Sequence, residues 1–189
     1  MIFQDKTITL KDGRTALLRS PREEDIPAVL EYLRLTAVET PFLRRSPEEC
    51  EKYTYEGEKE LFENWGASEY DVGIACFVGG ELAGLCNLTF RKSLKVRHRA
   101  SVGIALIRRF WGLGIGTAMF EEMIRIAGER EEVLQMELDF LEGNARARAL
   151  YEKMGFRIVG VHPNAIRLPD GRLLNEYHMI KTLDRQKQP

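Results

Sequence analysis

Three glycines at alternate positions, Gly112, Gly114 and Gly116, form the clearest chemical motif in this sequence. Because they lack side chains, such residues let the backbone pass close to a ligand with its N–H groups exposed. An apolar, strand-like run over residues 100–107 precedes them, and an amphipathic helical pattern follows. The first turn of a helix adds N–H donors and the positive end of the helix dipole. The motif therefore predicts an anion site, most typically for phosphate or pyrophosphate.

The residues around the glycines narrow the choice of ligand. A P-loop has a Lys followed by Ser or Thr after its last glycine, whereas here Thr117 follows Gly116 directly. A dinucleotide fingerprint needs a third glycine where this sequence has Thr117 or Met119. The motif matches neither pattern. A strand-to-helix turn that binds no ligand is the second interpretation.

The composition bounds the class of protein. With 189 residues, of which 44% are hydrophobic and 30% charged, the chain suits one globular domain over residues 1–189. Its formal net charge of −1 provides no global field to recruit nucleic acid or an anionic membrane. The first residues lack the pattern of a secretory signal, and no run approaches the roughly 20 apolar residues that span a bilayer. We expect neither nucleic acid nor a membrane as a partner.

The cysteines indicate a reducing compartment. Cys50, Cys76 and Cys86 are odd in number and form no CxxC pair, which is typical of free, buried thiols. The three histidines are scattered along the chain, so their spacing is not that of metal ligands. The sequence therefore predicts a cytoplasmic protein without a disulfide framework and without a metal site.

Turn and cap signals predict the elements before the glycine motif. Asp12-Gly13 and Gly79-Gly80, each between apolar runs, predict hairpins. Capping boxes at residues 20–23 and 46–49 predict two helices that begin at those boxes. The apolar linker over residues 37–43 either lines a substrate groove or packs a helix end against the core.

Beyond the glycine motif, residues 116–127 have a helical apolar stripe, and Glu122 is expected on the outward face. An alternating strand over residues 133–140 precedes a helix that Asn144 caps. Two closing strands are expected at residues 156–161 and 176–183. The order is hairpin, two helices, three strands, helix, strand, helix and two strands, which predicts a mixed α+β fold.

A second motif lies in this last part of the chain. From Asn144 to Phe156 the sequence fits N-x-x-A/S-x-x-L-Y-x-K-x-G-F, and it resembles one half of the signature of the GNAT N-acetyltransferase superfamily. The glycine motif resembles the family's pyrophosphate loop, Q/R-x-x-G-x-G/A, with Trp111 in place of Gln or Arg. The resemblance covers roughly residues 76–183, and the tail is similar to amino-acid and protein N-terminal acetyltransferases.

The resemblance implies an α+β fold with a mixed, mostly antiparallel central sheet, splayed at the acyl-CoA site, and helices on both faces. It implies acetyl-CoA as the donor and a primary amine as the acceptor, either a small amine or amino acid or a protein N-terminus. It also leaves room for a homodimer. The implied cofactor-binding residues are Ala105, Leu106, Ile107, Gly112, Leu113, Gly114, Ile115, Gly116, Thr117, Asn144 and Lys153. Tyr151 is implied as the acid that protonates the departing sulfur.

Several of these residues have a plain structural alternative. Asn144 can be a helix cap alone, Tyr151 a core aromatic residue, and Lys153 a solvated charge. Arg108 and Arg109 either contact phosphates or face solvent. The alternatives at the level of function are a CoA-binding regulatory module without catalysis and a structural protein whose glycine turn binds nothing.

The chemistry of amide formation sets further requirements. Only a neutral amine attacks a thioester, yet an α-amine titrates near about 8 and a lysine near about 10.4, so a base or a water chain must take a proton. The sequence offers five carboxylates for this task without favouring one: Glu39, Glu137, Asp139, Glu142 and Glu176. The cysteines with strand-like surroundings do not indicate a nucleophile, so direct attack in a ternary complex is expected.

Overall fold

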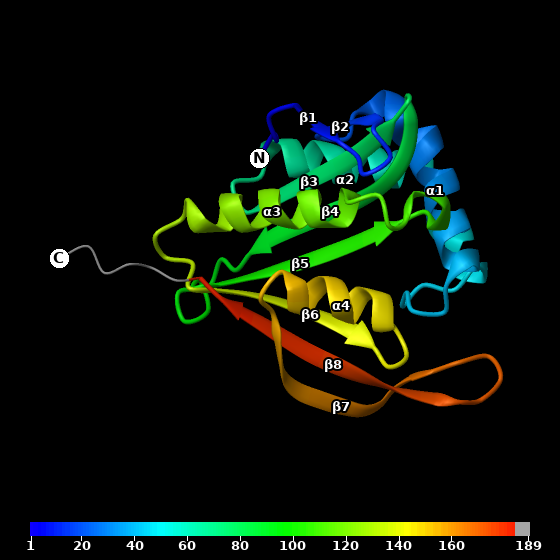
Figure 1. Cartoon of the computed structure of the whole chain (residues 1–189), viewed down its shortest axis with the longest axis vertical. Coiled ribbons are helices and arrows are strands. Elements are labelled where there is room, and N and C mark those ends of the chain that lie inside the picture. The colour runs from blue at the N-terminus through cyan, green and yellow to red at the C-terminus, as the bar shows by residue number, and fades with distance from the viewer. Residues whose placement is uncertain (184–189) are drawn as a thin grey trace. The chain divides into compact units, whose positions relative to one another are not determined.

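The computed structural model describes residues 1–183, and Figure 1 shows the elements that these residues form. In chain order they are β1 (Lys6–Thr9), β2 (Thr15–Arg19), α1 (Ile26–Glu39), α2 (Tyr55–Ala67), β3 (Asp71–Val78), β4 (Glu81–Phe90), β5 (Arg99–Leu106), α3 (Ile115–Gly128), β6 (Gln135–Leu141), α4 (Ala145–Lys153), β7 (Arg157–Arg167) and β8 (Leu173–Thr182). This order confirms the predicted succession of strands and helices.

The eight strands form a sheet in the order β1-β2-β3-β4-β5-β6-β8-β7. The pair β5–β6 is parallel, whereas the pairs β1–β2, β2–β3, β6–β8 and β7–β8 are antiparallel. The parallel ladder covers only Arg99–Ser101 opposite Gln135–Glu137, although β5 continues to Leu106. The predicted α+β fold with a mixed, mostly antiparallel and splayed sheet is confirmed.

The chain divides into two compact units. Unit 1 comprises Met1–Leu88 and Gly103–Met119, and unit 2 comprises Thr89–Val102 and the chain from Phe120 onward. The units are interleaved in the sequence, because β4, β5 and α3 each contribute residues to both.

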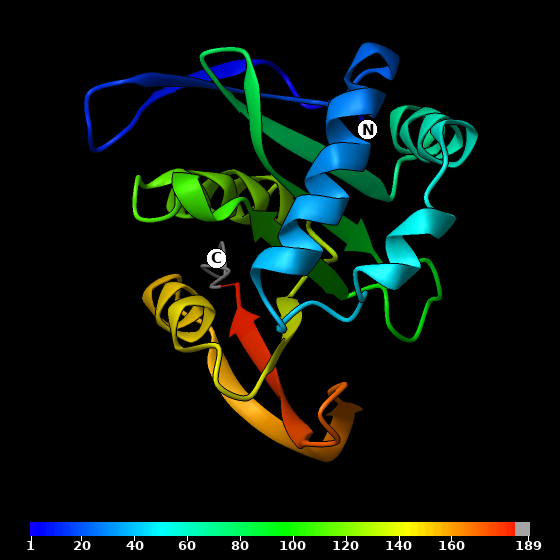
Figure 2. The same cartoon turned by 90° about the vertical axis from the view of Figure 1, so that its right-hand side faces the viewer.

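Unit 1 begins with the predicted hairpin. β1 and β2 are joined by a turn in which Gly13 has a φ of 86°, and the turn between β3 and β4 has positive φ at both Gly79 and Gly80. Positive φ is a conformation that glycine adopts without steric cost. Leu18 on β2 and Ile74 on β3 are fully buried in the core. Helices α1 and α2 lie side by side (Figure 2).

Helix α1 begins later than its predicted capping box. The Oγ atom of Ser20 accepts a hydrogen bond from the N–H of Phe3 (2.8 Å) and is therefore not the cap. Instead, Asp25 Oδ2 accepts from the N–H of Arg22 (2.7 Å) at the start of a 3₁₀ turn over Glu23–Asp25. The Asp25 carboxylate also binds the buried Arg19 guanidinium at 2.6 and 2.7 Å. This ion pair fixes where the helix begins, and a local pattern does not reveal it.

The second predicted helix is divided in the structure. The 46–49 box opens only a 3₁₀ turn over Glu48–Lys52, and α2 begins after Thr54, whose side chain accepts a hydrogen bond from the N–H of Gly57. The first part of the predicted linker belongs to α1, where Ala37 is buried and Val38 is exposed. Of the two interpretations of that segment, the structure favours the helix end.

Unit 2 is built on β6, β8 and β7. The last two strands form a twisted hairpin (Figure 1), and each extends further toward the hairpin turn than predicted. Met136 and Met179 are fully buried on the core face of β6 and β8. Asn144 caps α4 as predicted, because its side chain accepts a hydrogen bond from the N–H of Ala147 (3.2 Å).

Two carboxylates of unit 2 are more buried than the sequence pattern indicated. Glu122 was expected to face outward but is only 5% exposed, with Arg125 Nε 2.9 Å from its Oε2. Glu137 is 3% exposed and forms a bidentate ion pair with Arg99. In both cases an arginine neutralises the buried charge, so the polar residue is compatible with burial.

Candidate functional site

The glycine motif forms a tight turn before α3 in unit 1. Gly112 has a φ of 81° and Gly114 a φ of 95°, so both positions favour glycine over any residue with a Cβ atom. The first helical hydrogen bond runs from the N–H of Ala118 to the Gly114 carbonyl (3.1 Å). The N–H groups at the start of α3 lie at the positive end of the helix dipole, as at any helix N-terminus. The carbonyl of Leu113 accepts from the N–H of Lys11 (3.0 Å), which fixes the loop on the β1–β2 hairpin.

The end of β5 leads directly into this turn. The N–H of Ile107 donates to the carbonyl of Ala83 on β4 (2.9 Å). On the other side, the ladder with β6 has already ended at Ser101. The last residues of β5 therefore present backbone groups that no strand pairs on that side in the described part of the chain.

Side chains also bind the backbone of this strand end. The hydroxyl group of Tyr32 on α1 donates to the Ala105 carbonyl (3.0 Å). The indole N–H of Trp111, in the glycine turn, donates to the Leu106 carbonyl (2.7 Å). Sequence reasoning missed Tyr32, because nothing in its local pattern indicates that α1 contacts β5.

The two arginines before the turn bind carboxylates of unit 1. The backbone N–H of Arg108 donates to Glu39 Oε2 (2.7 Å), and its guanidinium group donates to the Glu39 carbonyl. Arg109 forms an ion pair with Glu81. Both arginine side chains are thus engaged within the protein, and Glu39 is fixed at the end of β5.

The remaining predicted site residues lie on α4 in unit 2. The ring of Tyr151 packs among Phe120, Phe140 and Phe156, with centroid distances of 5.4, 6.1 and 6.5 Å. Burial raises the pKa of the Tyr151 hydroxyl to about 12. The hydroxyl group therefore keeps its proton at neutral pH and is a donor rather than a base. Lys153, two residues after Tyr151 at the end of the same helix, is exposed.

Three of the predicted carboxylates belong to a polar face and its neighbouring loop in unit 2. Burial raises the pKa of Glu137, but hydrogen bonds from Arg99 and Gln135 outweigh this effect and hold it below its usual value. Asp139 Oδ1 lies 2.6 Å from His178 Nδ1, directly across the β6–β8 pair. Glu142 accepts from the N–H of Asn175 (3.1 Å).

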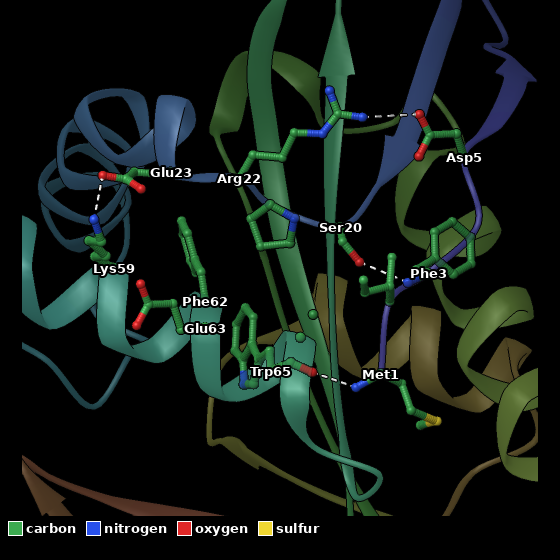
Figure 3. A pocket seen from close by; sticks show the side chains of 14 residues that line it. Met1, Phe3, Asp5, Ser20, Arg22, Glu23, Lys59, Phe62, Glu63 and Trp65 are labelled. Atoms are coloured by element: carbon green, nitrogen blue, oxygen red, sulfur yellow. Dashed lines mark hydrogen bonds and ion pairs between the residues drawn. The ribbon is translucent and has the colours of Figure 1, made fainter.

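A hollow of about 320 Å³ in unit 1 is lined by different residues (Figure 3). Phe62 and Trp65 contribute stacked aromatic rings, 5.9 Å apart, to its wall. At its rim Lys59 Nζ lies 2.8 Å from Glu23 Oε1. None of the residues predicted for the site lines this hollow. The residues predicted in unit 1 lie instead at the end of β5 and in the glycine turn, where most of them are half-buried or buried.

The described residues hold neither a metal-ligand cluster nor a membrane span. Among residues 1–183 no group of three or more His, Cys, Asp or Glu side chains could hold a metal ion. No α-helix in that range is long and apolar enough to cross a bilayer.

Comparison with known families agrees with the two motifs and the fold. The model of the acetyltransferase (GNAT) family matches residues 36–156, which is more than half of the chain and includes both the glycine turn and α4. The protein therefore belongs to the GNAT acetyltransferase family.

The chain is similar to a curated enzyme and to solved structures. It is 28% identical over 108 residues to the L-amino acid N-acetyltransferase AaaT of Escherichia coli (strain K12), and this match covers 57% of the chain and 65% of that enzyme. The match thus spans just under two thirds of that relative's length.

Among solved structures, a GNAT acetyltransferase from Streptococcus pneumoniae is 25% identical, with a TM-score of 0.82 over 89% of this chain and 99% of that one. The structure of yncA from Salmonella typhimurium with its cofactor acetyl-CoA is 18% identical, with a TM-score of 0.76 over 92% and 97% of the two chains. At this identity the second likeness shows the fold alone.

Proposed function

We propose that the protein is an N-acetyltransferase that moves an acetyl group from acetyl-CoA to a primary amine by direct attack in a ternary complex. The whole chain acts as one such domain in this proposal. The observation that carries it is the strand end of β5, whose pairing with β6 stops at Ser101 and which leads into a glycine turn with positive φ at Gly112 and Gly114.

The backbone of unit 1 fits acetyl-CoA. Its pyrophosphate would be bound by the main-chain N–H groups of Gly112–Thr117, at the positive end of the α3 dipole. The pantetheine arm would pair with the backbone of Ala105–Ile107. Any other residue at the two positive-φ glycines would strain the loop. Close contact between backbone and phosphate also requires glycine, so the loop geometry and the proposed ligand favour the same residue type. When bound, acetyl-CoA supplies an acetyl group activated as a thioester.

The proposal also assigns roles to residues of α4 in unit 2. Tyr151 is the proposed proton donor to the departing sulfur, and its pKa of about 12 keeps the proton available through neutral pH. Asn144, the cap of the helix, is also a proposed CoA contact, and Lys153 is the proposed phosphate contact. The exposed position of Lys153 supports this role.

The structure narrows the choice of proton acceptor. Glu137 is buried in its ion pair with Arg99, which makes it a poor base because its proton affinity is lowered. The remaining candidates are Glu39, Asp139, Glu142 and Glu176. Of these, Asp139 is in contact with another titratable side chain, His178.

An activity assay tests which class of amine accepts the acetyl group. The similarity to an L-amino acid N-acetyltransferase supports free amino acids as the first class, and peptides with a free N-terminus are the second. We expect release of the CoA thiol only when both acetyl-CoA and an amine of one class are present, with an acetylated product detected by mass spectrometry. An acceptor that is already N-acetylated is the control. Binding of acetyl-CoA without thiol release from any amine would favour the alternative, a CoA-binding regulatory module.

A further inference from the structure

The two peptide groups on either side of Leu106 are each held by a side chain from another segment of unit 1. The Tyr32 hydroxyl donates to the carbonyl of Ala105 (3.0 Å), and the Trp111 indole donates to the carbonyl of Leu106 (2.7 Å). Tyr32 is 3% exposed, so its hydrogen bond is shielded from water. A strand end normally frays, and these bonds oppose fraying at one residue.

These contacts fix the direction of the Leu106 N–H group. Peptide groups are planar and, among residues 1–183, all trans, so the N–H of Leu106 points opposite to the Ala105 carbonyl that Tyr32 holds. The next peptide group is fixed in the same way, because its N–H, on Ile107, donates to Ala83 on β4. Both polar groups of Leu106 therefore point away from β4, on the side where the ladder with β6 has ended.

Close packing from β4 restricts the same residue. A Cβ atom on Gly84 would lie 2.3 Å from Leu106 Cδ2 and 2.6 Å from the Ala105 oxygen. The glycine thus lets β4 approach the strand end without room for a lateral shift. Leu106 is held from three directions: by β4, by α1 and by the glycine turn.

An N–H group that is held in this way is a preorganised donor. Charge that develops on an acyl oxygen during transfer is stabilised most by donors that need no reorganisation at the moment of reaction. We propose that Tyr32 and Trp111 are positioning residues that hold the Leu106 N–H toward the acyl oxygen of the donor. This inference rests on the proposed acetyltransferase function and assigns two side chains to it that act through the backbone.

Trp111 connects the glycine turn to the end of β5. Its ring lies in the glycine turn, and its N–H group donates to the strand end. The guanidinium of Arg108 lies 5.5 Å from the centre of the same ring, and the backbone of Arg108 is anchored by Glu39. The indole is thus itself held in place.

The test uses Tyr32→Phe and Trp111→Phe, which remove one donor each and keep an aromatic ring. The matched control is Tyr55→Phe, which removes a tyrosine hydroxyl group of unit 1 that donates to Glu23 Oε1 (3.2 Å) rather than to β5. Two quantities are measured for each protein. They are kcat/KM for acetyl-CoA and, by calorimetry, the Kd for 3′-phosphoadenosine 5′-diphosphate, which has the nucleotide part of CoA and no pantetheine or acyl group.

We expect Tyr32→Phe and Trp111→Phe to lower kcat/KM for acetyl-CoA by about tenfold each, because one hydrogen bond that orients a donor is lost. The Kd for the nucleotide should stay within about twofold of the wild-type value, and Tyr55→Phe should leave both quantities near wild type. If one variant fails to fold, the other decides.

Two results would overturn the inference while the proposed function stands. One is wild-type kcat/KM in both folded variants, and the other is a parallel loss of nucleotide affinity, which would indicate general loosening of unit 1. A wild-type protein that neither binds acetyl-CoA nor releases thiol would overturn the proposed function, and the inference with it.

Discussion

Tyr151 is the residue on which the proposed chemistry depends most. Its ring is buried among three phenylalanines, and burial holds its pKa near 12. A group with this pKa keeps its proton over the whole pH range in which an amine acceptor becomes neutral. It can therefore donate that proton there. It cannot serve as the base, because it is not ionised there.

Replacement of Tyr151 by Phe should lower kcat by about 10²-fold, because a proton donor in the transition state is lost while the ring packing is retained. KM for acetyl-CoA and the midpoint of thermal unfolding should change little. Tyr177→Phe is the matched control, since Tyr177 belongs to the same aromatic cluster, with its ring 5.1 Å from that of Phe140. Equal turnover in wild type and Tyr151→Phe would assign the residue to the core.

At the residue scale, local patterns identified some groups and missed others. Asn144 is a cap because its short side chain reaches a backbone N–H three residues on, and that rule is local. The burial of Glu122 and the contact of Asp139 with His178 depend on residues from elsewhere in the chain or on packing. No pattern within a few residues reveals such contacts.

Among the elements, β5 is the one on which the proposed function depends most. Its first residues pair with β6, and its last residues are fixed by Tyr32 and Trp111. The pairing with β6 stops midway along the strand, at Ser101. Two substitutions test the two ends of this strand.

Gly84→Ala tests the C-terminal end of β5, at Ala105 and Leu106. The new Cβ atom would lie 2.6 Å from the Ala105 carbonyl oxygen, so the strand end must shift. We expect a loss of about 1–3 kcal/mol in the free energy of unfolding, as for other overpacked sites, and weaker binding of acetyl-CoA. Gly66→Ala is the control, because a Cβ atom there meets nothing within 4 Å. Unchanged stability and affinity in Gly84→Ala would contradict the tight packing at Leu106.

A substitution in the Arg99–Glu137 ion pair tests the N-terminal end of β5, which pairs with β6. Removing the arginine in Arg99→Ala should cost roughly 1–3 kcal/mol, less than for a fully buried pair because the Arg99 side chain is 35% exposed. The measurement is chemical unfolding at pH 7. A loss no larger than that of an exposed ion pair, such as Arg148–Glu152, would show that the buried carboxylate does not depend on its partner.

The same pair predicts a pH dependence. The pKa of Glu137 is lower in the folded protein than in the unfolded chain, so its stabilising contribution is present above the unfolded value of about 4.3 and is lost as the pH falls through the folded value. The free energy of unfolding of Glu137→Gln should therefore vary less with pH between 5 and 2 than that of the wild type. Parallel curves for the two proteins would exclude this linkage.

The elements themselves were largely predictable. Hairpin turns at Asp12-Gly13 and Gly79-Gly80 were found because glycine at positive φ marks such turns in any context. The start of α1 was missed, because the Arg19–Asp25 ion pair and the Phe3–Ser20 hydrogen bond join segments that are distant in the sequence or belong to different elements. Helix boundaries that depend on such contacts are not encoded locally.

At the scale of the whole molecule, two motifs and their order indicate the family, and the match of the family model to residues 36–156 confirms it. The glycine turn belongs to unit 1 and Tyr151 to unit 2. The family is recognisable from sequence because both motifs constrain the residue type at particular positions, such as glycine at positive φ. The N-terminal half has no comparable motif that would identify an acceptor.

Acetyl-CoA binding is the central claim, and thermal unfolding of the whole protein with and without millimolar acetyl-CoA tests it most directly. A ligand at about 100 times its Kd stabilises a folded protein by about 2.7 kcal/mol, which at this size corresponds to a rise of about 5–10 °C in the midpoint. The account predicts such a rise, and a smaller one when Gly114, with its φ of 95°, is replaced by a bulky residue. An unchanged midpoint at every concentration would contradict the acetyltransferase function and leave the glycine turn as a structural feature alone.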